Sequence, residues 1–331
     1  MRVIVLGGTG FIGRAIVDEL RIHASDVLVI HRGTSEPGGD GRVSHLHVAR
    51  ADLPTAQAEI ASFRPDALID VQPYTRTDAR HVVDVVDGDL RFVVLSSMDV
   101  YRAYHGFRTG IATDPVPLDE TAPVREERYP YRGEGRGFDD YDKLDVEDVY
   151  RPRGATVLRL GAVYGEFDGQ RREEFILGRV RAGRPTIPFG PGTLRWSRAY
   201  VHDVASAVRR ALMTDAASGE VFNICETDTW SIRSWADRII AAAGSVAELV
   251  EVPEELLPVD LRITGSFAQH LLGDPSKAVE LLGFAETDRQ VALRRSVEWH
   301  LAHPPSRERD LSAADVALAG GSSETARRDG K

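Results

Sequence analysis

Short, mainly apolar runs alternate with amphipathic stretches through the first half of the chain. The runs lie at residues 3–6, 27–30, around 43–48, 67–71, 92–95 and 156–160. Helical spacing of apolar residues occurs over 11–20, 78–86 and a stretch containing 143–150. Runs without strict apolar–polar alternation suit strands covered on both faces, and their alternation with helices is typical of a parallel sheet. The pattern predicts an α/β fold, with a doubly wound Rossmann sheet over residues 1–165.

The second half of the chain has a different texture. Glycine and proline punctuate the residues after Gly165, which indicates loops and short strands. A strand end and helix are expected over 200–213, a strand at 221–224, and helices at 230–243 and 275–282. We expect a smaller C-terminal α/β substrate lobe over 166–303, with segments crossing back to the first sheet. Small and charged residues dominate 304–331, which predicts a disordered tail.

Composition and charge exclude several classes of function. The chain has 331 residues, a net charge of -10 and one cysteine. The negative charge argues against a general nucleic-acid or anionic-membrane binder. A lone Cys225 excludes an internal disulfide framework, and no metal site is expected, because the nearby pair His45 and His47 lacks an evident third ligand. Without an apolar run of about 18 residues or an evident signal segment, the chain is expected to be cytoplasmic.

A glycine-rich loop, GGTGFIG at residues 7–13, connects the first predicted strand to the first predicted helix. In such a loop the first glycine permits a tight turn, the second lets the backbone approach a pyrophosphate, and the third lets the helix pack on the sheet. The amino end of the helix presents free N–H groups and partial positive charge to phosphates. The context required of the motif is met. It predicts a dinucleotide site that includes Gly7, Thr9, Gly10, Phe11, Ile12 and Gly13.

The end of the second predicted strand indicates which dinucleotide is bound. An acidic residue there usually binds the ribose 2′-hydroxyl of NAD, whereas an arginine accommodates the 2′-phosphate of NADP. Here His31 is followed by Arg32. NADP(H) is therefore favoured over NAD(H). Asp52 and Leu53, after the third predicted strand, are candidate adenine contacts.

The order of motifs resembles the extended short-chain dehydrogenases/reductases, the NAD(P)-dependent epimerase/dehydratase family, over roughly residues 1–300. The landmarks are residues 7–13, Asp52-Leu53, SSMDVY at 96–101, Lys143 with Glu147, LRLGAVYG at 158–165, YVHDVA at 200–205, FNI at 222–224 and DPSK at 274–277. The resemblance implies further cofactor contacts from Val71, Lys143, Gly161 and Val163. It also implies a homodimer formed through the helices at 78–86 and 143–150.

In this family a serine or threonine, a tyrosine and a lysine act together on a substrate oxygen while hydride moves to or from the nicotinamide. Ser97 and Lys143 match the serine and the lysine. The tyrosine does not match, because the family spacing is Tyr-x-x-x-Lys and Asp139 stands four residues before Lys143. Tyr141 is two residues before the lysine, about 200° around a helix axis.

Tyr141 and Lys143 therefore converge only if the helix begins near them, with Asp139 or Asp140 as N-cap. Tyr131 and Tyr101 are the alternatives to Tyr141.

Two further groups bear on the chemistry. Asp99 stands where dehydratases of this family carry a glutamate that removes a proton beside a transient ketone, and an aspartate bonding its own loop is the competing interpretation. An arginine cluster predicts an anionic, sugar-nucleotide-like substrate. Its members are Arg132, Arg136, Arg171, Arg172, Arg195 and Arg198, of which Arg132, Arg195 and Arg198 are the principal candidates.

Three functions remain open from the sequence. The first is an NADP(H)-dependent oxidoreductase or epimerase/dehydratase using Ser97, Lys143 and either Tyr141 or Tyr131, with Asp99 as an additional base. The second is a non-redox isomerase or lyase on the same fold. The third is a protein that senses the cofactor without turnover.

Overall fold

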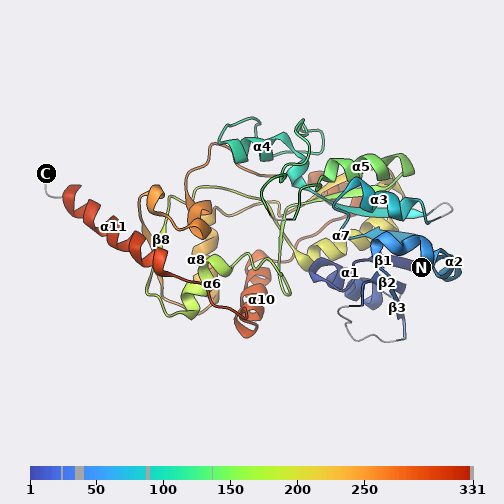
Figure 1. Ribbon diagram of the computed structural model, residues 1–331, viewed down its shortest axis with the longest axis horizontal. Helices are drawn as coiled ribbons and strands as arrows, with labels where there is room; N and C mark the ends of the chain where they lie inside the picture. The colour runs from blue at the N-terminus through green and yellow to red at the C-terminus, as the bar shows by residue number, and fades with distance from the viewer. Residues whose placement is uncertain (24, 34–40, 87–89, 136, 329–331) are drawn as a thin grey trace.

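A seven-stranded parallel sheet forms the centre of the structure, a computed structural model that describes residues 1–23, 25–33, 41–86, 90–135 and 137–328 (Figure 1). The spatial order is β10-β6-β5-β4-β1-β2-β3, and every neighbouring pair is parallel. The strands are β1 (Arg2–Leu6), β2 (Asp26–His31), β3 (Val43–His47), β4 (Ala67–Asp70), β5 (Arg91–Ser97), β6 (Thr156–Leu160) and β10 (Val221–Ile224). The predicted α/β Rossmann class is confirmed.

Helices cover both faces of this sheet, which explains why its strands are apolar without alternation. Val3 and Val5 of β1 belong to the core beneath α1 (Phe11–Ile22) and α7 (Val201–Met213). Ile4 and Leu6 face the opposite core. That second core is covered by a 3-10 helix, η1 (Arg50–Ala56), and by α2 (Gln57–Phe63), α3 (Arg76–Val83) and α5 (Lys143–Tyr150).

Helix α3 begins two residues before the start expected from the apolar spacing. Thr75 is its N-cap, and its hydroxyl accepts a hydrogen bond from the Asp78 amide at 3.0 Å. The Asp78 carboxylate in turn accepts from the Thr75 amide at 3.0 Å. This capping box fixes the first turn through polar groups that an apolar pattern does not register.

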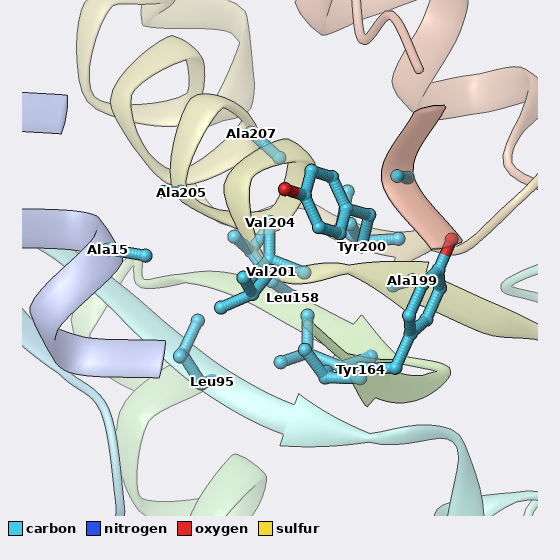
Figure 2. Packing of buried hydrophobic residues seen from close by; sticks show 14 of the residues in the cluster. Ala15, Leu95, Leu158, Tyr164, Ala199, Tyr200, Val201, Val204, Ala205 and Ala207 are labelled. Atoms are coloured by element: carbon cyan, nitrogen blue, oxygen red, sulfur yellow. The ribbon is translucent and has the colours of Figure 1, made fainter. Parts of the chain in front are cut away.

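The second half of the chain contributes α7 and β10 to the first-half sheet. Figure 2 shows Ala15 of α1, Leu95 of β5 and Leu158 of β6 beside Val201 and Val204 of α7. Strand β10 pairs with β6 and completes one edge of the sheet. The sheet therefore needs both halves of the sequence.

The remaining elements form a smaller body at the end of the molecule that carries the C-terminus (Figure 1). Its two-stranded sheets pair β8 with β11 and β7 with β9. The bounds are β7 (Ala162–Tyr164), α6 (Glu174–Arg181), β8 (Thr186–Phe189), β9 (Arg198–Tyr200), α8 (Ile232–Ala242), β11 (Glu248–Glu251) and α10 (Arg289–Ala302). Helix α9 (Ser276–Leu282) packs instead on β10 and α7 of the main body. Short 3-10 helices are η2 (Met98–Val100), η3 (Arg151–Arg153), η4 (Asp215–Ala217), η5 (Glu254–Leu256) and η6 (Val259–Thr264), and α4 is Arg102–Thr109.

The prediction of a disordered tail over 304–331 is wrong for much of that segment, because the structure has a helix, α11 (Ser312–Arg328). Leu311, Ala314 and Ala317 are buried where the start of this helix packs on β8 and η5. Arg184 and Asp315 form an ion pair of 2.8 Å across the contact. Spacing of three residues places the three apolar side chains on one helical face, but two of them are alanines, which composition alone does not mark as core. Residues 329–331 lie outside the described part.

Candidate active site

The glycine loop lies at the carboxyl edge of the sheet, where the strand order reverses between β1 and β4. This crevice is where open parallel α/β sheets bind ligands. Gly7 follows β1 with φ of 84°, a left-handed conformation that glycine adopts without strain. Its amide donates to the Ile30 carbonyl at 3.0 Å, which ties the turn to β2. The turn therefore directs the chain into α1 above the crevice.

Gly13 and Gly10 are required for different reasons. A Cβ atom at Gly13 would lie 2.1 Å from the Gly7 carbonyl oxygen, so helix and loop touch there through bare backbone. A Cβ atom at Gly10 would meet nothing within 4 Å. Gly10 is the N-cap of α1, without a side-chain cap. Space above Gly10 beside an open helix amino end is the environment that a pyrophosphate needs.

These two glycines make a matched pair of variants. Gly13→Ala is expected to lower the melting temperature by several degrees, because its Cβ collides with backbone. Gly10→Ala is expected to leave the melting temperature nearly unchanged and to weaken cofactor binding at least about tenfold, since its methyl group occupies the ligand's space. Scanning calorimetry and titration calorimetry separate the two effects. A Gly10→Ala protein that binds NAD(P) like wild type would contradict this placement.

The other predicted cofactor residues fall into two groups. Arg32 and Asp52 are exposed at the carboxyl edge, and Val71 lies 3.7 Å from the Cβ position of Gly7. Leu53 and Val163 are instead buried in the two cores of the sheet. Their contribution to a nucleotide site is to shape the backbone that surrounds it.

Histidines gather at the same edge. His31 Nε2 and His45 Nδ1 lie 3.0 Å apart, and the ring of His47 stands edge-on to His31 at 4.7 Å between centroids. His31 is therefore a third histidine beside His45 and His47, which the sequence pattern does not indicate. Within the described residues, however, no group of three or more His, Cys, Asp or Glu side chains is arranged to hold a metal ion.

A cavity of about 720 Å³ opens beside the carboxyl ends of β5 and β6; we call it the catalytic cavity. Four predicted catalytic residues line it, together with Gly161. They are Ser97, Asp99, Tyr131 and Tyr141. Tyr101 does not join them: it is buried, and its hydroxyl donates to Asn223 at 2.7 Å.

The displaced Tyr141 reaches this cavity because α5 begins late. Helix α5 starts at Lys143, and Asp142 is its N-cap, with a carboxylate that accepts from the Leu144 amide at 2.9 Å. The expectation of Asp139 or Asp140 as N-cap is wrong by two or three residues. Since Tyr141 precedes the cap, it is not bound by helical geometry, and the 200° separation from Lys143 does not apply.

Two tyrosines converge on one carboxylate. The hydroxyl groups of Tyr141 and Tyr131 donate to Asp99 Oδ2 at 2.8 and 3.0 Å. Ser97 Oγ accepts from the Asp99 amide at 3.1 Å, and its side chain lies close enough to Tyr141 to lower the pKa of that phenol, against the larger effects of burial and the Asp99 charge. Asp99 Oδ1 has no hydrogen-bond partner within the described residues, although it is buried. The four side chains form one cluster at the wall of the catalytic cavity.

Burial dominates the electrostatics of this cluster. It raises the pKa of Asp99, against the hydrogen bond from Tyr141 and the charge of Arg125. Burial, followed by the Asp99 charge, raises the pKa of Tyr141 well above its usual value. Both groups therefore favour their protonated forms more than they would in water.

Lys143 is buried beneath the cluster. Its Nζ donates to the Pro73 and Leu95 carbonyl oxygens at 2.7 and 2.9 Å, and lies 5.3 Å from the centroid of the Tyr74 ring. Burial lowers the pKa of Lys143 to about 8, against the charges of Asp70 and Asp99. The ammonium is thus fixed between the segment that follows β4 and strand β5.

Comparison with known families accounts for this combination of loop, serine and lysine. The model of the NAD dependent epimerase/dehydratase family matches residues 3–225, which include the glycine loop, Ser97 and Lys143. The chain belongs to that family. The predicted family is therefore confirmed.

Relatives within and around the family have several activities. The chain is 28% identical over 265 residues to 2'-dehydrokanamycin reductase of Streptomyces kanamyceticus, covering 77% of this chain and 70% of the relative. It resembles the crystal structure of UDP-glucose 4-epimerase from Thermotoga maritima, with a TM-score of 0.66, 21% identity, and coverage of 91% of this chain and 99% of the other. UDP-glucuronic acid 4-epimerase from Bacillus cereus, in complex with UDP-glucuronic acid and NAD, has a TM-score of 0.66, 18% identity, and coverage of 91% and 99%. At these identities the structures establish the shared fold.

A buried ion pair replaces the helical register by which other members of the family place their tyrosine. Arg125 and Asp142 have almost no exposed side-chain surface and form two hydrogen bonds, of 2.6 and 3.1 Å. Arg125 Nε also donates to the Asp99 carbonyl at 3.1 Å. Although burial raises the pKa of Asp142, the bonds from Arg125 hold it below its usual range. The pair connects the loop of Asp99 to the residue between Tyr141 and Lys143.

A second cavity, of about 290 Å³, carries the arginines; we call it the arginine cavity. It shares Ala162, Gln170, Arg172 and Trp196 with the catalytic cavity, so the two are adjacent. Four arginines line it against one acid, and they are Arg171, Arg172, Arg198 and Arg309, opposite Asp260. Three of these arginines are paired with carboxylates: Arg171 with Glu174, Arg172 with Asp168 and Arg309 with Asp260.

Arg198 is the arginine of this cavity whose side chain can form a further hydrogen bond. It is buried, its guanidinium lies 4.0 Å from the centroid of the Trp235 ring, and Nη1 donates to the Trp230 carbonyl at 3.2 Å. Its Nη2 has no hydrogen-bond partner within the described part of the chain. A buried donor without a partner is destabilising unless a ligand satisfies it.

The other predicted substrate arginines are not brought to these cavities. Arg132 is exposed, packs over the ring of Tyr129 at 4.1 Å and pairs with Asp140. Arg195 is exposed and is absent from the lining of both cavities. Arg136 lies outside the described residues. Of the three principal candidates, Arg198 lines the arginine cavity, whereas Arg132 and Arg195 line neither cavity.

Proposed function

We propose that the chain transfers hydride between a nicotinamide dinucleotide and a hydroxyl- or carbonyl-bearing carbon of an anionic, sugar-like small molecule. The observation that carries the proposal is the position of the Tyr141 hydroxyl beside Ser97 in the catalytic cavity, although the family spacing to Lys143 is missing. Loss of the motif in the sequence therefore does not mean loss of the constellation. The family supports the reaction class.

The glycine loop fits the cofactor. Gly10 leaves open space above the amino end of α1, where the pyrophosphate would bind. Gly161 lines the catalytic cavity, and Lys143 is fixed beside β5 by its bond to the Leu95 carbonyl. When bound, the nicotinamide supplies or accepts the hydride.

The residues of the chain handle the proton and the oxygen. Tyr141 exchanges a proton with the substrate oxygen, and Ser97 holds that oxygen by a hydrogen bond. Lys143 supports both with fixed positive charge in a low-dielectric site. The adjacent arginine cavity would bind the anionic end of the substrate, chiefly through Arg198.

The cofactor preference rests on Arg32. Arg32→Glu is expected to weaken NADP(H) binding about 10–100-fold, the effect of a lost charge-assisted hydrogen bond of about 1.5–3 kcal/mol, and to improve NAD(H) binding. Titration calorimetry with both cofactors measures the ratio. The matched control is Arg294→Glu on α10, an exposed site outside the crevice. Tighter binding of NAD(H) than NADP(H) by the wild type would overturn the preference.

The experiment for the proposed function follows nicotinamide absorbance while the protein is mixed with nucleotide sugars and anionic keto sugars. Product analysis in the same reactions detects epimerisation without net redox change. Turnover that disappears in Lys143→Ala is expected. Tight cofactor binding with no turnover on any compound would instead favour the sensing protein.

A second candidate reaction rests on the unpartnered Asp99 Oδ1. A carboxylate oxygen without a partner in the catalytic cavity is suited to removing a proton beside a transient ketone. The substrate would then exchange that hydrogen with deuterated solvent, with no net change of the cofactor. Simple hydride transfer gives no such exchange.

We also propose a cytoplasmic homodimer formed through α3 and α5, which lie side by side on one face of the sheet. Within the described residues, none of the helices has the length and apolar character needed to cross a bilayer.

A further inference from the structure

Two tyrosine hydroxyl groups lie at Asp99, whereas the family reaction uses one tyrosine. Tyr131 and Tyr141 come from different parts of a long connection between η2 and α5, yet both donate to the same oxygen, Asp99 Oδ2. Their rings lie 5.2 Å apart between centroids. Tyr141 is 9% exposed, whereas Tyr131 is partly exposed. The carboxylate therefore connects a buried phenol to one nearer solvent.

This arrangement opposes the tyrosinate that alcohol oxidation requires. An ionised Tyr141 would place a second negative charge 2.8 Å from Asp99 Oδ2 in a buried site. The nearest cations are already engaged. Arg125 is paired with Asp142, and Lys143 Nζ donates to two main-chain carbonyl oxygens.

Resting on the proposed function, we propose that Asp99, Tyr131 and Tyr141 form a proton-holding cluster, in which Asp99 and Tyr131 keep Tyr141 protonated so that it can donate a proton to a carbonyl oxygen. Tyr141 is its proton donor. Tyr131 and Asp99 are the groups that return a proton to it.

The step balances in protons and electrons. The carbonyl carbon gains a hydride from a reduced nicotinamide dinucleotide, and the electron pair of the C=O π bond moves to oxygen. The Tyr141 O–H bond breaks as that oxygen takes the proton, so the carbonyl is reduced to an alcohol and the cofactor is oxidised. As the Tyr141 proton leaves, the Tyr131 proton moves through Asp99 Oδ2 to Tyr141, and Tyr131 regains a proton from solvent.

The other charged groups near the cluster do not favour an ionised Tyr141. Burial, then the Asp99 charge, raises the pKa of Tyr131, and the Arg108 guanidinium 4.9 Å from the centroid of its ring opposes the shift. Arg108 is itself paired with Glu134. Burial raises the pKa of Tyr104, and Asp99 adds to the shift. The other titratable groups lining the catalytic cavity are Tyr74, His105, Arg125, Glu127 and Arg172.

The first test needs no cofactor or substrate. The ultraviolet signal of tyrosinate is titrated in the wild type and in Tyr141→Phe, and the difference isolates Tyr141 among the nine tyrosines. We expect no ionisation of Tyr141 near pH 10, where an unperturbed tyrosine is half ionised. A Tyr141 that titrates at or below about pH 10 would overturn the proposal.

The second test removes the charge of the cluster. In Asp99→Asn, the tyrosines are expected to ionise at lower pH, because the negative charge beside their hydroxyl groups is gone. Asp237→Asn, at an exposed position on α8, is the control. An unchanged tyrosine titration would contradict the cluster's role. If Asp99→Asn fails to fold, the wild-type titration still decides.

Failure of the proposed function looks different. If the wild type transfers hydride in neither direction, the proposed function is wrong. The tyrosine titration independently shows whether Tyr141 holds its proton. Hydride transfer by a wild type in which Tyr141 titrates at or below about pH 10 refutes the cluster and leaves the proposed function intact.

Discussion

Tyr141→Phe is expected to lower kcat for carbonyl reduction by about 10²–10⁴-fold, the usual contribution of a positioned general acid. The hydroxyl is the group of Tyr141 that meets Ser97 and Asp99, whereas the ring packs against Tyr74, Tyr131 and Phe138. Phenylalanine keeps this ring packing. Cofactor affinity and the melting temperature should therefore stay close to wild type, which calorimetry measures.

Tyr131→Phe is the matched comparison, because it removes a hydroxyl that donates to the same carboxylate oxygen. We expect a loss of about tenfold or less, since Tyr131 resupplies protons rather than meeting the substrate oxygen. A larger loss in Tyr131→Phe than in Tyr141→Phe would assign the family role to Tyr131.

Asp142→Asn is expected to reduce the free energy of unfolding by about 3–5 kcal/mol, because it leaves Arg125 buried without its charged partner. Asparagine is as good an N-cap as aspartate, so the bond to the Leu144 amide is retained and loss of charge is isolated. Urea denaturation measures the change. Activity should fall as well, since Asp142 stands between Tyr141 and Lys143.

The control for this substitution is Asp148→Asn on the same helix. Its carboxylate pairs with Arg76 and Arg128 but is 54% exposed, so the expected change is below about 1 kcal/mol. Equal effects of the two substitutions would show that the Arg125–Asp142 pair has no special role in placing the site.

The sheet and the cofactor loop could be predicted because their signals are local. Each strand is an apolar run covered on both faces, and residues 7–13 carry in seven positions the turn, the open space at Gly10 and the close contact at Gly13. Such features need no knowledge of distant partners.

The position of the tyrosine could not be predicted from spacing. The Tyr-x-x-x-Lys rule assumes that both residues belong to one helix, and the cap at Asp142 removes Tyr141 from it. A sequence with Asp at 139, 140 and 142 offers three possible caps. Asp142 is the cap because its carboxylate pairs with the buried Arg125. The segment between these two residues is highly charged, so the sequence does not show which carboxylate pairs with Arg125.

The substrate side shows the same limit. The sequence offers six arginines, with Arg132, Arg195 and Arg198 as the principal candidates. In the structure, burial beside Trp235 distinguishes Arg198, and Arg309 joins the cavity from beyond α10. Arg132 packs over a tyrosine ring and Arg195 is exposed to solvent, because the loops that carry them place them outside the cavity. Long-range packing decides which charges meet a ligand.

A crystal structure with the oxidised dinucleotide bound tests the account most directly. It should show the pyrophosphate over Gly10 and nicotinamide C4 facing the Tyr141 hydroxyl and Ser97, with Tyr131 on the far side of Asp99. A nicotinamide ring that faces Tyr131, or one held away from all four side chains of the cluster, would contradict the account.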